Sequence, residues 1–179
     1  METNTTKPTW VLDPTHSELT FKVRHMMIAN VKGAFTDFSI QIEGEDLLQS
    51  NILVTVAADS IQTNQTDRDN HLKSADFFDT ELFKTLSFKS TSLKHKEDNE
   101  YVLKGLLTIK DVEKEVALEV DFGGINKDPW GNEKAGFSVS GKINRKDWGL
   151  HWNAALETGG MLVSEEVKIF AELQFVKQA

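Results

Sequence analysis

Hydrophobic and polar residues alternate with a period of two over most of the chain. The clearest run lies in residues 167–175, where one face carries Val167, Ile169, Ala171, Leu173 and Phe175. Such alternation is typical of a strand with one buried and one solvated face. The pattern recurs in residues 19–23, 31–42, 52–56, 86–88, 103–109, 116–122 and 137–143. It therefore predicts about eight strands.

The connections between these strands are rich in turn-forming residues. Turns are expected at residues 43–46, within the polar run 94–100, at Gly123 with Gly124, and at residues 128–132. Connections this short favour antiparallel pairing. Between Phe35 and Phe38 the alternation changes phase, which predicts a β-bulge.

About eight antiparallel strands with one apolar face each either pack as a sandwich or close into a barrel. Three glycines, Gly33, Gly105 and Gly141, fall on the apolar face of their strands. Interior glycines either bend strands at barrel corners or leave space inside. Both interpretations favour a barrel, and the second favours a cavity.

Residues 66–79, TDRDNHLKSADFFD, break the alternation. Thr66 and Asp69 have the spacing of a capping box, so we expect a short helical insertion from residue 66 to about residue 74. Asp67 lies one helical turn before His71 and can pair with it. This pair either anchors the helix or, in an alternative hypothesis, makes His71 a general base acting on a lipid-like substrate at the barrel mouth.

Composition and charge narrow the class of protein. The chain of 179 residues fits a single domain, residues 1–179, and its lack of cysteine excludes disulfides and thiolate chemistry. The net charge is -8 and the cations are scattered along the sequence, so neither nucleic acid nor an anionic membrane is expected as a partner. No run approaches the roughly 20 apolar residues of a spanning helix, so no membrane insertion is expected. Without a secretory signal at its start we expect the cytoplasm, or the periplasm if a leader was removed.

Motifs for catalysis, metals and nucleotides are missing from the sequence. The five histidines show neither H-x-H nor H-E-x-x-H spacing, and GFSVSG at residues 136–141 misses the serine hydrolase elbow. No glycine-rich phosphate loop occurs. We therefore expect no catalytic residue, no metal and no cofactor. In the segment INRKDWGLHW, residues 143–152, Trp148 is either part of an aromatic rim or a plug in the barrel end.

Six linked motifs resemble the YceI-like family of lipid and polyisoprenoid-binding proteins, from about residue 10 to residue 176. They are WVLDPTHS (10–17) with FKVRH (21–25), VKGAF (31–35), DSIQT (59–63), RDNHLKSADFFD (68–79), KGLLTIK (104–110) and INRKDWGL (143–150). The resemblance implies an all-β, eight-stranded antiparallel, lipocalin-like barrel. It also implies an apolar lumen that holds a long amphiphile, such as a polyisoprenoid, an isoprenoid quinone or a fatty-acid derivative, without catalysing a reaction on it. Dimers occur in such proteins, so a homodimer is a further expectation.

The ligand contacts follow from strand parity and from the 66–79 segment. We expect an apolar wall made by Phe21, Val23, Met27, Phe35, Val54, Phe77, Phe78, Phe88, Gly105, Leu107, Phe137, Val139, Ile143 and Trp148. We expect the polar end of the ligand beside His25, Arg68, His71 and Asn144. Such a lumen needs few polar groups, because these serve only to orient the guest.

Overall fold

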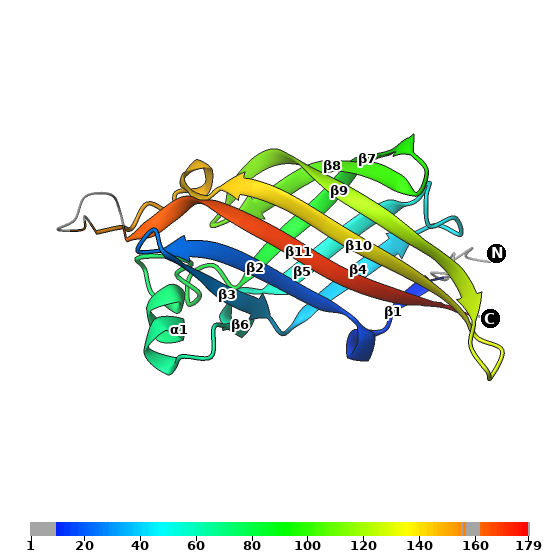
Figure 1. Cartoon of the computed structure of the whole chain (residues 1–179), viewed down its shortest axis with the longest axis horizontal. Coiled ribbons are helices and arrows are strands. Elements are labelled where there is room, and N and C mark those ends of the chain that lie inside the picture. The colour runs from blue at the N-terminus through cyan, green and yellow to red at the C-terminus, as the bar shows by residue number, and fades with distance from the viewer. Residues whose placement is uncertain (1–9, 155, 157–161, 179) are drawn as a thin grey trace, which may run out of the picture.

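The computed structural model describes residues 10–154, 156 and 162–178. In this part of the chain the fold is an elongated β-barrel with one short α-helix (Figure 1). Its elements are β1 (Trp10–Leu12), η1 (Pro14–His16), β2 (Glu18–His25), β3 (Ala29–Phe35), β4 (Phe38–Glu43), β5 (Asn51–Ala57), η2 (Ala58–Ser60), β6 (Ile61–Gln62), α1 (Thr66–Lys73), β7 (Thr85–Glu97), β8 (Glu100–Ile109), β9 (Val112–Lys127), β10 (Glu133–Asn144), η3 (Arg145–Trp148) and β11 (Val163–Lys177).

Eight strands form a closed antiparallel ring in the order β1, β4, β5, β7, β8, β9, β10 and β11, and β11 pairs with β1 to close it. β11 is longer than β1, and beyond β1 it pairs with β2. β3 pairs with β2, and β6 pairs with β3, which extends the sheet. The predicted eight-stranded antiparallel barrel and its short helix are therefore confirmed. We call the end that carries α1 and the β2–β3 hairpin the helix end, and the end with the start of β1 and the end of β11 the terminal end (Figure 1).

Two details of the strand prediction are wrong. The phase shift between Phe35 and Phe38 is not a bulge, because β3 ends at the first and β4 begins at the second. β3 pairs with β2 and β6, whereas β4 pairs with β1 and β5, so the break moves the chain to new neighbours. The pair Gly123 and Gly124 is not a turn either. It lies inside β9 opposite the register shift at Gly136, and Gly124 has φ of 94°, the left-handed conformation found in glycine-containing β-bulges.

The three interior glycines are covered by large side chains from neighbouring strands. Phe21 covers Gly33, Phe88 covers Gly105 and Leu118 covers Gly141. A Cβ atom at any of these glycines would overlap the covering side chain. The glycines thus let bulky groups lie flat against the barrel wall, which is a recognised way of rescuing glycine in sheets.

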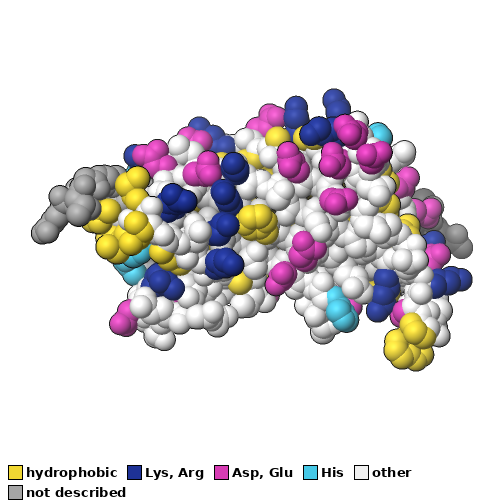
Figure 2. All heavy atoms as spheres, in the orientation of Figure 1, with side chains coloured by type: hydrophobic (Ala, Val, Ile, Leu, Met, Phe, Trp, Pro, Cys, Tyr) yellow, Lys and Arg dark blue, Asp and Glu magenta, His cyan; other side chains and the backbone are white. Residues whose placement is uncertain are grey.

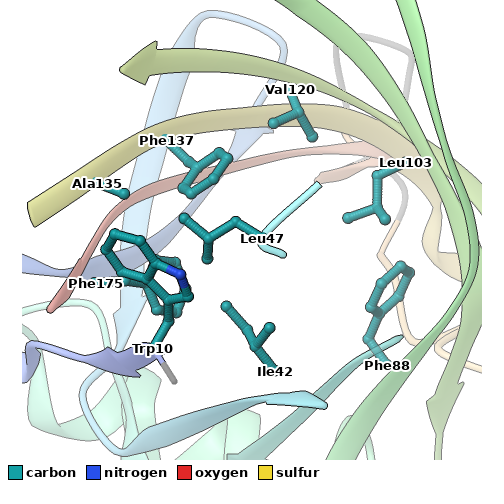
Figure 3. Close-up of a cluster of buried hydrophobic side chains, with 9 residues drawn as sticks. All are labelled: Trp10, Ile42, Leu47, Phe88, Leu103, Val120, Ala135, Phe137 and Phe175. Atoms are coloured by element: carbon teal, nitrogen blue, oxygen red, sulfur yellow. The ribbon is translucent and has the colours of Figure 1, made fainter. Parts of the chain in front are cut away.

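Two apolar clusters fill the ends of the barrel. Figure 3 shows the terminal-end cluster, whose side chains point inward from the surrounding strands: Trp10, Ile42, Leu47, Phe88, Leu103, Val120, Ala135, Phe137 and Phe175. The helix-end cluster contains Phe35, Val56, Ala58, Ile61, Phe77, Leu86, Ile109, Trp148 and Leu150. None of the helices among the described residues is long and apolar enough to cross a membrane.

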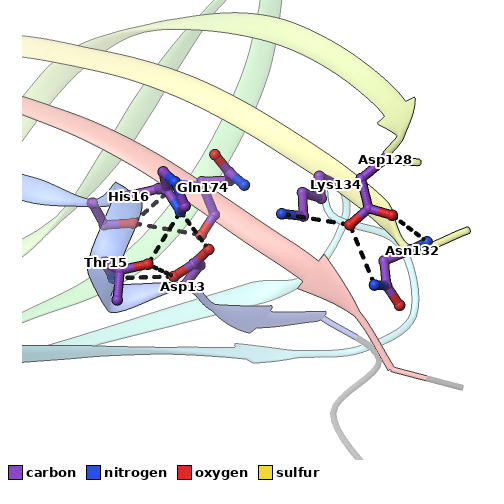
Figure 4. Close-up of polar contacts among 8 residues, drawn as sticks. Asp13, Thr15, His16, Asp128, Asn132, Lys134 and Gln174 are labelled. Carbon is purple, nitrogen blue, oxygen red and sulfur yellow. Dashed lines mark hydrogen bonds and ion pairs between the residues drawn. The ribbon is translucent and has the colours of Figure 1, made fainter. Parts of the chain in front are cut away.

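Carboxylates hold two of the connections in place (Figure 4). Asp13, at the start of η1, accepts hydrogen bonds from the Thr15 hydroxyl at 2.7 Å and from His16 Nδ1 at 2.8 Å. These contacts, that of Thr15 foremost, lower the pKa of Asp13 to about 2. In the β9–β10 turn Asp128 accepts the backbone N–H groups of Trp130 and Asn132, each at 2.9 Å, and the Asn132 bond contributes most to lowering its pKa.

Replacing Asp13 with asparagine is expected to lower the free energy of unfolding at pH 7 by about 1 kcal/mol, because the amide can still cap η1 but removes the charge that strengthens the hydrogen bonds from Thr15 and His16. Because the folded-state pKa lies below the ordinary value, the carboxylate stabilises the fold above about pH 4 and loses this effect as the pH falls to about 2. The difference between parent and Asp13→Asn should therefore shrink over this range. Urea unfolding at a series of pH values measures it, and a constant difference would contradict the assignment.

Candidate functional site

A cavity of about 230 Å³ lies inside the barrel, between the two apolar clusters. A single water molecule needs roughly 10–15 Å³, so the cavity has room for a chain of many atoms. Residues of both end clusters line it, including Phe175 near the terminal end and Leu150 near the helix end. Thr20 and Ser87 are the polar residues among those that line it. The cavity therefore runs along the barrel and is almost wholly apolar.

Much of the predicted wall does line this cavity. The predicted residues that line it are Phe21, Phe35, Val54, Phe78, Phe88, Leu107, Phe137, Val139 and Ile143. Strand parity placed the strand residues among them correctly because successive side chains of a strand point to opposite faces, whereas Phe78 was predicted from the 66–79 segment. Their contact with a ligand stays a prediction.

The predicted wall was incomplete: it omitted strand residues such as Val167 and Ile169, and also residues of the connections. Leu47 lies in the β4–β5 connection and Leu150 follows η3. Both are buried, with 5% and 4% of their surface exposed. The signal for Leu47 was an apolar pair, Leu47 and Leu48, inside an otherwise polar segment.

Five predicted wall residues do not line the cavity. Val23 is half-buried near the helix end of β2, and Met27 is 57% exposed at the tip of the β2–β3 hairpin. Gly105 lies under the ring of Phe88. Met27 was misplaced because strand alternation ends at His25, where the hairpin turn begins.

The other two are Phe77 and Trp148, which belong to the helix-end cluster. Trp148 is 2% exposed and its Nε1 donates to the Leu107 carbonyl at 2.9 Å. Of the two interpretations of Trp148, the structure supports the plug. Phe77 packs against the rings of His71 and Trp152. Of the two adjacent phenylalanines, Phe78 is the one that reaches the cavity.

None of the four residues expected at a polar end lines the cavity. Arg68 donates to the hydroxyl and the carbonyl oxygen of Thr63, each at 2.7 Å. Asn144 accepts the backbone N–H of Lys146 and caps η3, and His25 is half-buried at the end of β2. Arg68 and Asn144 therefore hold local structure.

His71 has a different partner from the one expected. Its Nε2 atom lies 2.9 Å from the Asp76 carboxylate, and the ring meets Trp152 edge-on at a centroid distance of 4.6 Å. Because His71 does not line the cavity and Asp67 is not its partner, the general-base hypothesis gains no support. Within the described residues, no three His, Asp or Glu side chains are grouped to hold a metal ion.

The expected capping box at the start of α1 is also wrong. The N-cap is Gln65, without a side-chain hydrogen bond. Asp69 instead accepts the backbone N–H of Thr63 at 2.8 Å and the Thr63 hydroxyl at 2.5 Å. Asp69 and Arg68 thus both bind the buried Thr63, which ties α1 to the segment after β6.

Arg145 organises the helix end of the cavity. Its guanidinium is 3% exposed and donates to the carbonyl oxygens of Leu150 (2.6 Å), Trp152 (3.0 Å) and Ser164 (2.9 Å). Burial lowers the pKa of Arg145, and the charge is solvated by backbone dipoles instead of water. These bonds hold the residues after η3 against β11 and so place Leu150 in the cavity wall.

Comparison with known proteins identifies the family. The YceI-like domain matches residues 10–175 of this chain. The chain belongs to the YceI-like family. A UPF0312 protein of Staphylococcus epidermidis is 42% identical over 166 residues, which cover 91% of this chain and 94% of the relative.

Solved YceI-like barrels share the fold. BcnA of Burkholderia cenocepacia superposes with a TM-score of 0.78 at 22% identity, over 91% of this chain and 98% of that one. A polyisoprenoid binding domain from Saccharophagus degradans superposes with a TM-score of 0.72 at 16% identity, over 96% and 100%. At these identities the likeness concerns the fold.

Replacing Arg145 with methionine should lower the free energy of unfolding by about 3 kcal/mol, because several buried carbonyl groups lose their donors. Lys146→Met is the matched control, since this neighbouring lysine makes an exposed ion pair with Glu165 and should change stability by less than about 1 kcal/mol. Urea unfolding measures both. Equal effects would show that Arg145 does not organise this end.

Proposed function

We propose that this YceI-like protein binds and carries, or sequesters, a long apolar or amphiphilic chain inside the barrel. The observation that supports this most strongly is the cavity of about 230 Å³ with an almost wholly apolar wall. A cavity of this size left empty costs roughly 5 kcal/mol of stability, at about 24 cal/mol per Å³. A bound chain would restore the lost packing contacts.

The energetics suit a guest that is mostly hydrocarbon. Each methylene transferred from water to an apolar site contributes roughly 0.8 kcal/mol. About a dozen methylenes thus supply around 10 kcal/mol before the costs of association, without directed polar contacts. A polyisoprenoid, an isoprenoid quinone and a fatty-acid-like lipid all meet this requirement. The same fold serves as a polyisoprenoid binding domain in Saccharophagus degradans, which supports a prenyl chain as one class of guest.

The proposed role is non-enzymatic because the wall lacks the groups that catalysis uses. Among the residues that the structure describes, those that line the cavity include no His, Asp, Glu, Lys or Arg. Thr20 and Ser87 also border it, but strand parity directs their hydroxyls to the outer face, as it does for Thr55, the partner of Ser87. Binding without chemical change fits this lining.

The direct test is to identify what co-purifies. Native mass spectrometry of the protein, and mass spectrometry of its organic-solvent extract, should reveal an amphiphile with a long hydrocarbon chain. Purified protein that carries no such molecule, and that also fails to bind prenols or fatty acids, would refute the proposal.

A ring placed inside the lumen should block binding. Val54 lines the cavity and Thr55, the next residue of β5, points outward and is exposed. We expect Val54→Phe to weaken binding of palmitate and of a series of prenols about tenfold or more, because overfilling costs about 1–3 kcal/mol. Thr55→Phe is the control and should bind like the parent. Titration with each ligand by calorimetry measures the difference, and equal weakening by both variants would place the guest elsewhere.

A further inference from the structure

Four lysines stand side by side on the outside of the barrel. Lys142 of β10 pairs with Lys168 of β11, Lys168 pairs with Lys22 of β2, and Lys22 pairs with Lys32 of β3. We call these four residues the lysine row. In Figure 2, Lys and Arg side chains form a band across this face of the sheet. The cations are scattered along the sequence, but the strand register brings four of them together.

The lysine row is not explained by folding stability. Like charges directly opposite each other weaken a sheet. Within the described part of the chain none of the four lysines forms an ion pair. Lys22 and Lys168 are also half-buried, and the Lys22 ammonium lies 6.0 Å from the centroid of the Phe170 ring. The protein has a net charge of -8, so acidic residues are plentiful. If folding stability alone determined what surrounds the lysine row, acidic side chains would be expected to pair with these lysines.

Charge is instead graded along the barrel axis. The outward residues one step toward the terminal end, Thr20 and Phe170, are uncharged. The next step brings Glu18 opposite Glu172, four residues and about 13 Å from the row at roughly 3.3 Å per residue. On the helix-end side, Glu166 lies opposite Asn144, while Glu165 is paired with Lys146 at 2.7 Å. With Arg24 of β2 one step from Lys22 offsetting Glu166, the helix-end side of the row is close to neutral, whereas the terminal-end side carries Glu18 and Glu172.

The β2–β3 hairpin extends beyond the lysine row at the helix end, and its tip is apolar. Met26, Met27 and Ile28 are 45%, 57% and 84% exposed. In Figure 2 apolar side chains gather at this end of the molecule. Met26 and Met27 have φ of 53° and 61°, the left-handed conformation for which hairpins favour Asn and Gly. Turn chemistry therefore does not account for two methionines at these positions.

We propose that the hairpin tip and the lysine row together dock the protein on an anionic phospholipid bilayer. Lys22 and Lys32 are each four residues from the tip, about 13 Å at roughly 3.3 Å per residue. Apolar side chains of interfacial segments enter a bilayer by about 5–10 Å, so the tip reaches the acyl boundary while the lysines face the phosphates.

The sequence predicted that an anionic membrane is not a partner, because the lysines and arginines are scattered along it. The strand register gathers four of these lysines on one face, so the proposal differs from that prediction. It builds on the proposed function, since a bilayer is where a long apolar chain resides. Docking orients the helix end of the cavity, lined there by Phe78 and Leu150, toward that source.

Co-sedimentation with vesicles tests docking without any added guest. The parent should bind vesicles of phosphatidylglycerol and phosphatidylcholine much more tightly than vesicles of phosphatidylcholine alone. Binding should fall steeply between about 0.1 and 1 M salt, as the Debye length drops from about 10 to about 3 Å. Lys22→Gln with Lys168→Gln should weaken binding roughly 25-fold, at about fivefold per lysine. Lys89→Gln with Lys94→Gln, on the exposed face of β7, is the control with the same change in net charge.

The hairpin provides a second variant that separates docking from folding. Met26→Asn with Met27→Gly suits the turn, so it should raise the unfolding temperature while weakening vesicle binding at least tenfold. Trp130→Ser, at an 82% exposed residue of the β9–β10 turn, is the control at the terminal end and should leave binding unchanged.

Several results would overturn the proposal. They are no preference for anionic vesicles, unchanged binding in both test variants, or equal loss in the controls. Binding of random-sequence duplex DNA as tight as vesicle binding would assign the lysine row to nucleic acid instead. Loss of a dimer in the hairpin variant on gel filtration, with vesicle binding unchanged, would make the tip a self-association surface. A co-purified lipid without vesicle binding would refute docking but not the carrier function. Vesicle binding by a protein that takes up no lipid would refute the carrier function but not docking.

Discussion

Three residue pairs between β1 and β11 close the sheet into a ring, and the hollow interior depends on this closure. Trp10 lies opposite Lys177, Val11 opposite Val176 and Leu12 opposite Phe175. An open sheet of this length would expose two edges and could collapse onto itself as a sandwich. Because β1 has only three residues, the same β11 strand also pairs with β2 farther along. One long strand thus carries both the closure and the continuation of the barrel toward the helix end.

Closure creates a space that side chains fill only in part. The two ends are packed by aromatic and aliphatic clusters, with Trp10 and Leu47 at one end and Trp148 at the other. Along the wall, Phe21 and Phe88 lie flat over glycines instead of reaching across the lumen. Large side chains that lie flat against the wall cover the strands and leave the centre of the barrel unfilled. The barrel contains many large side chains, so the cavity exists because of where these side chains lie and not because they are few.

The fold and the inward face of each strand could be predicted because alternation is a local property that parity reveals. The position of a residue along the barrel axis could not be predicted, because alternation does not reveal it. Val23 and Phe21 share a face, yet only Phe21 lines the cavity. The partner of His71 could not be predicted either. Sequence spacing indicated Asp67, whereas in the structure His71 contacts Asp76. The row of lysines escaped detection because the register between four strands, and not sequence distance, brings them together.

An apolar wall discriminates poorly among chains of similar length, since one methylene more or less changes the binding free energy little. Because the side chains that point into the cavity are apolar, a cavity that binds a chain as proposed would select by length, width and branching but hardly by headgroup. Selectivity for one guest among many hydrophobic molecules then depends on where the barrel meets them. On the proposed function, the inner face of the strands would set how much hydrocarbon is held, and on the proposed docking the outer face would set which lipid source the protein meets. Both faces are encoded by the same strands in alternate residues: Phe21 and Gly33 face the lumen, while their neighbours Lys22 and Lys32 face outward.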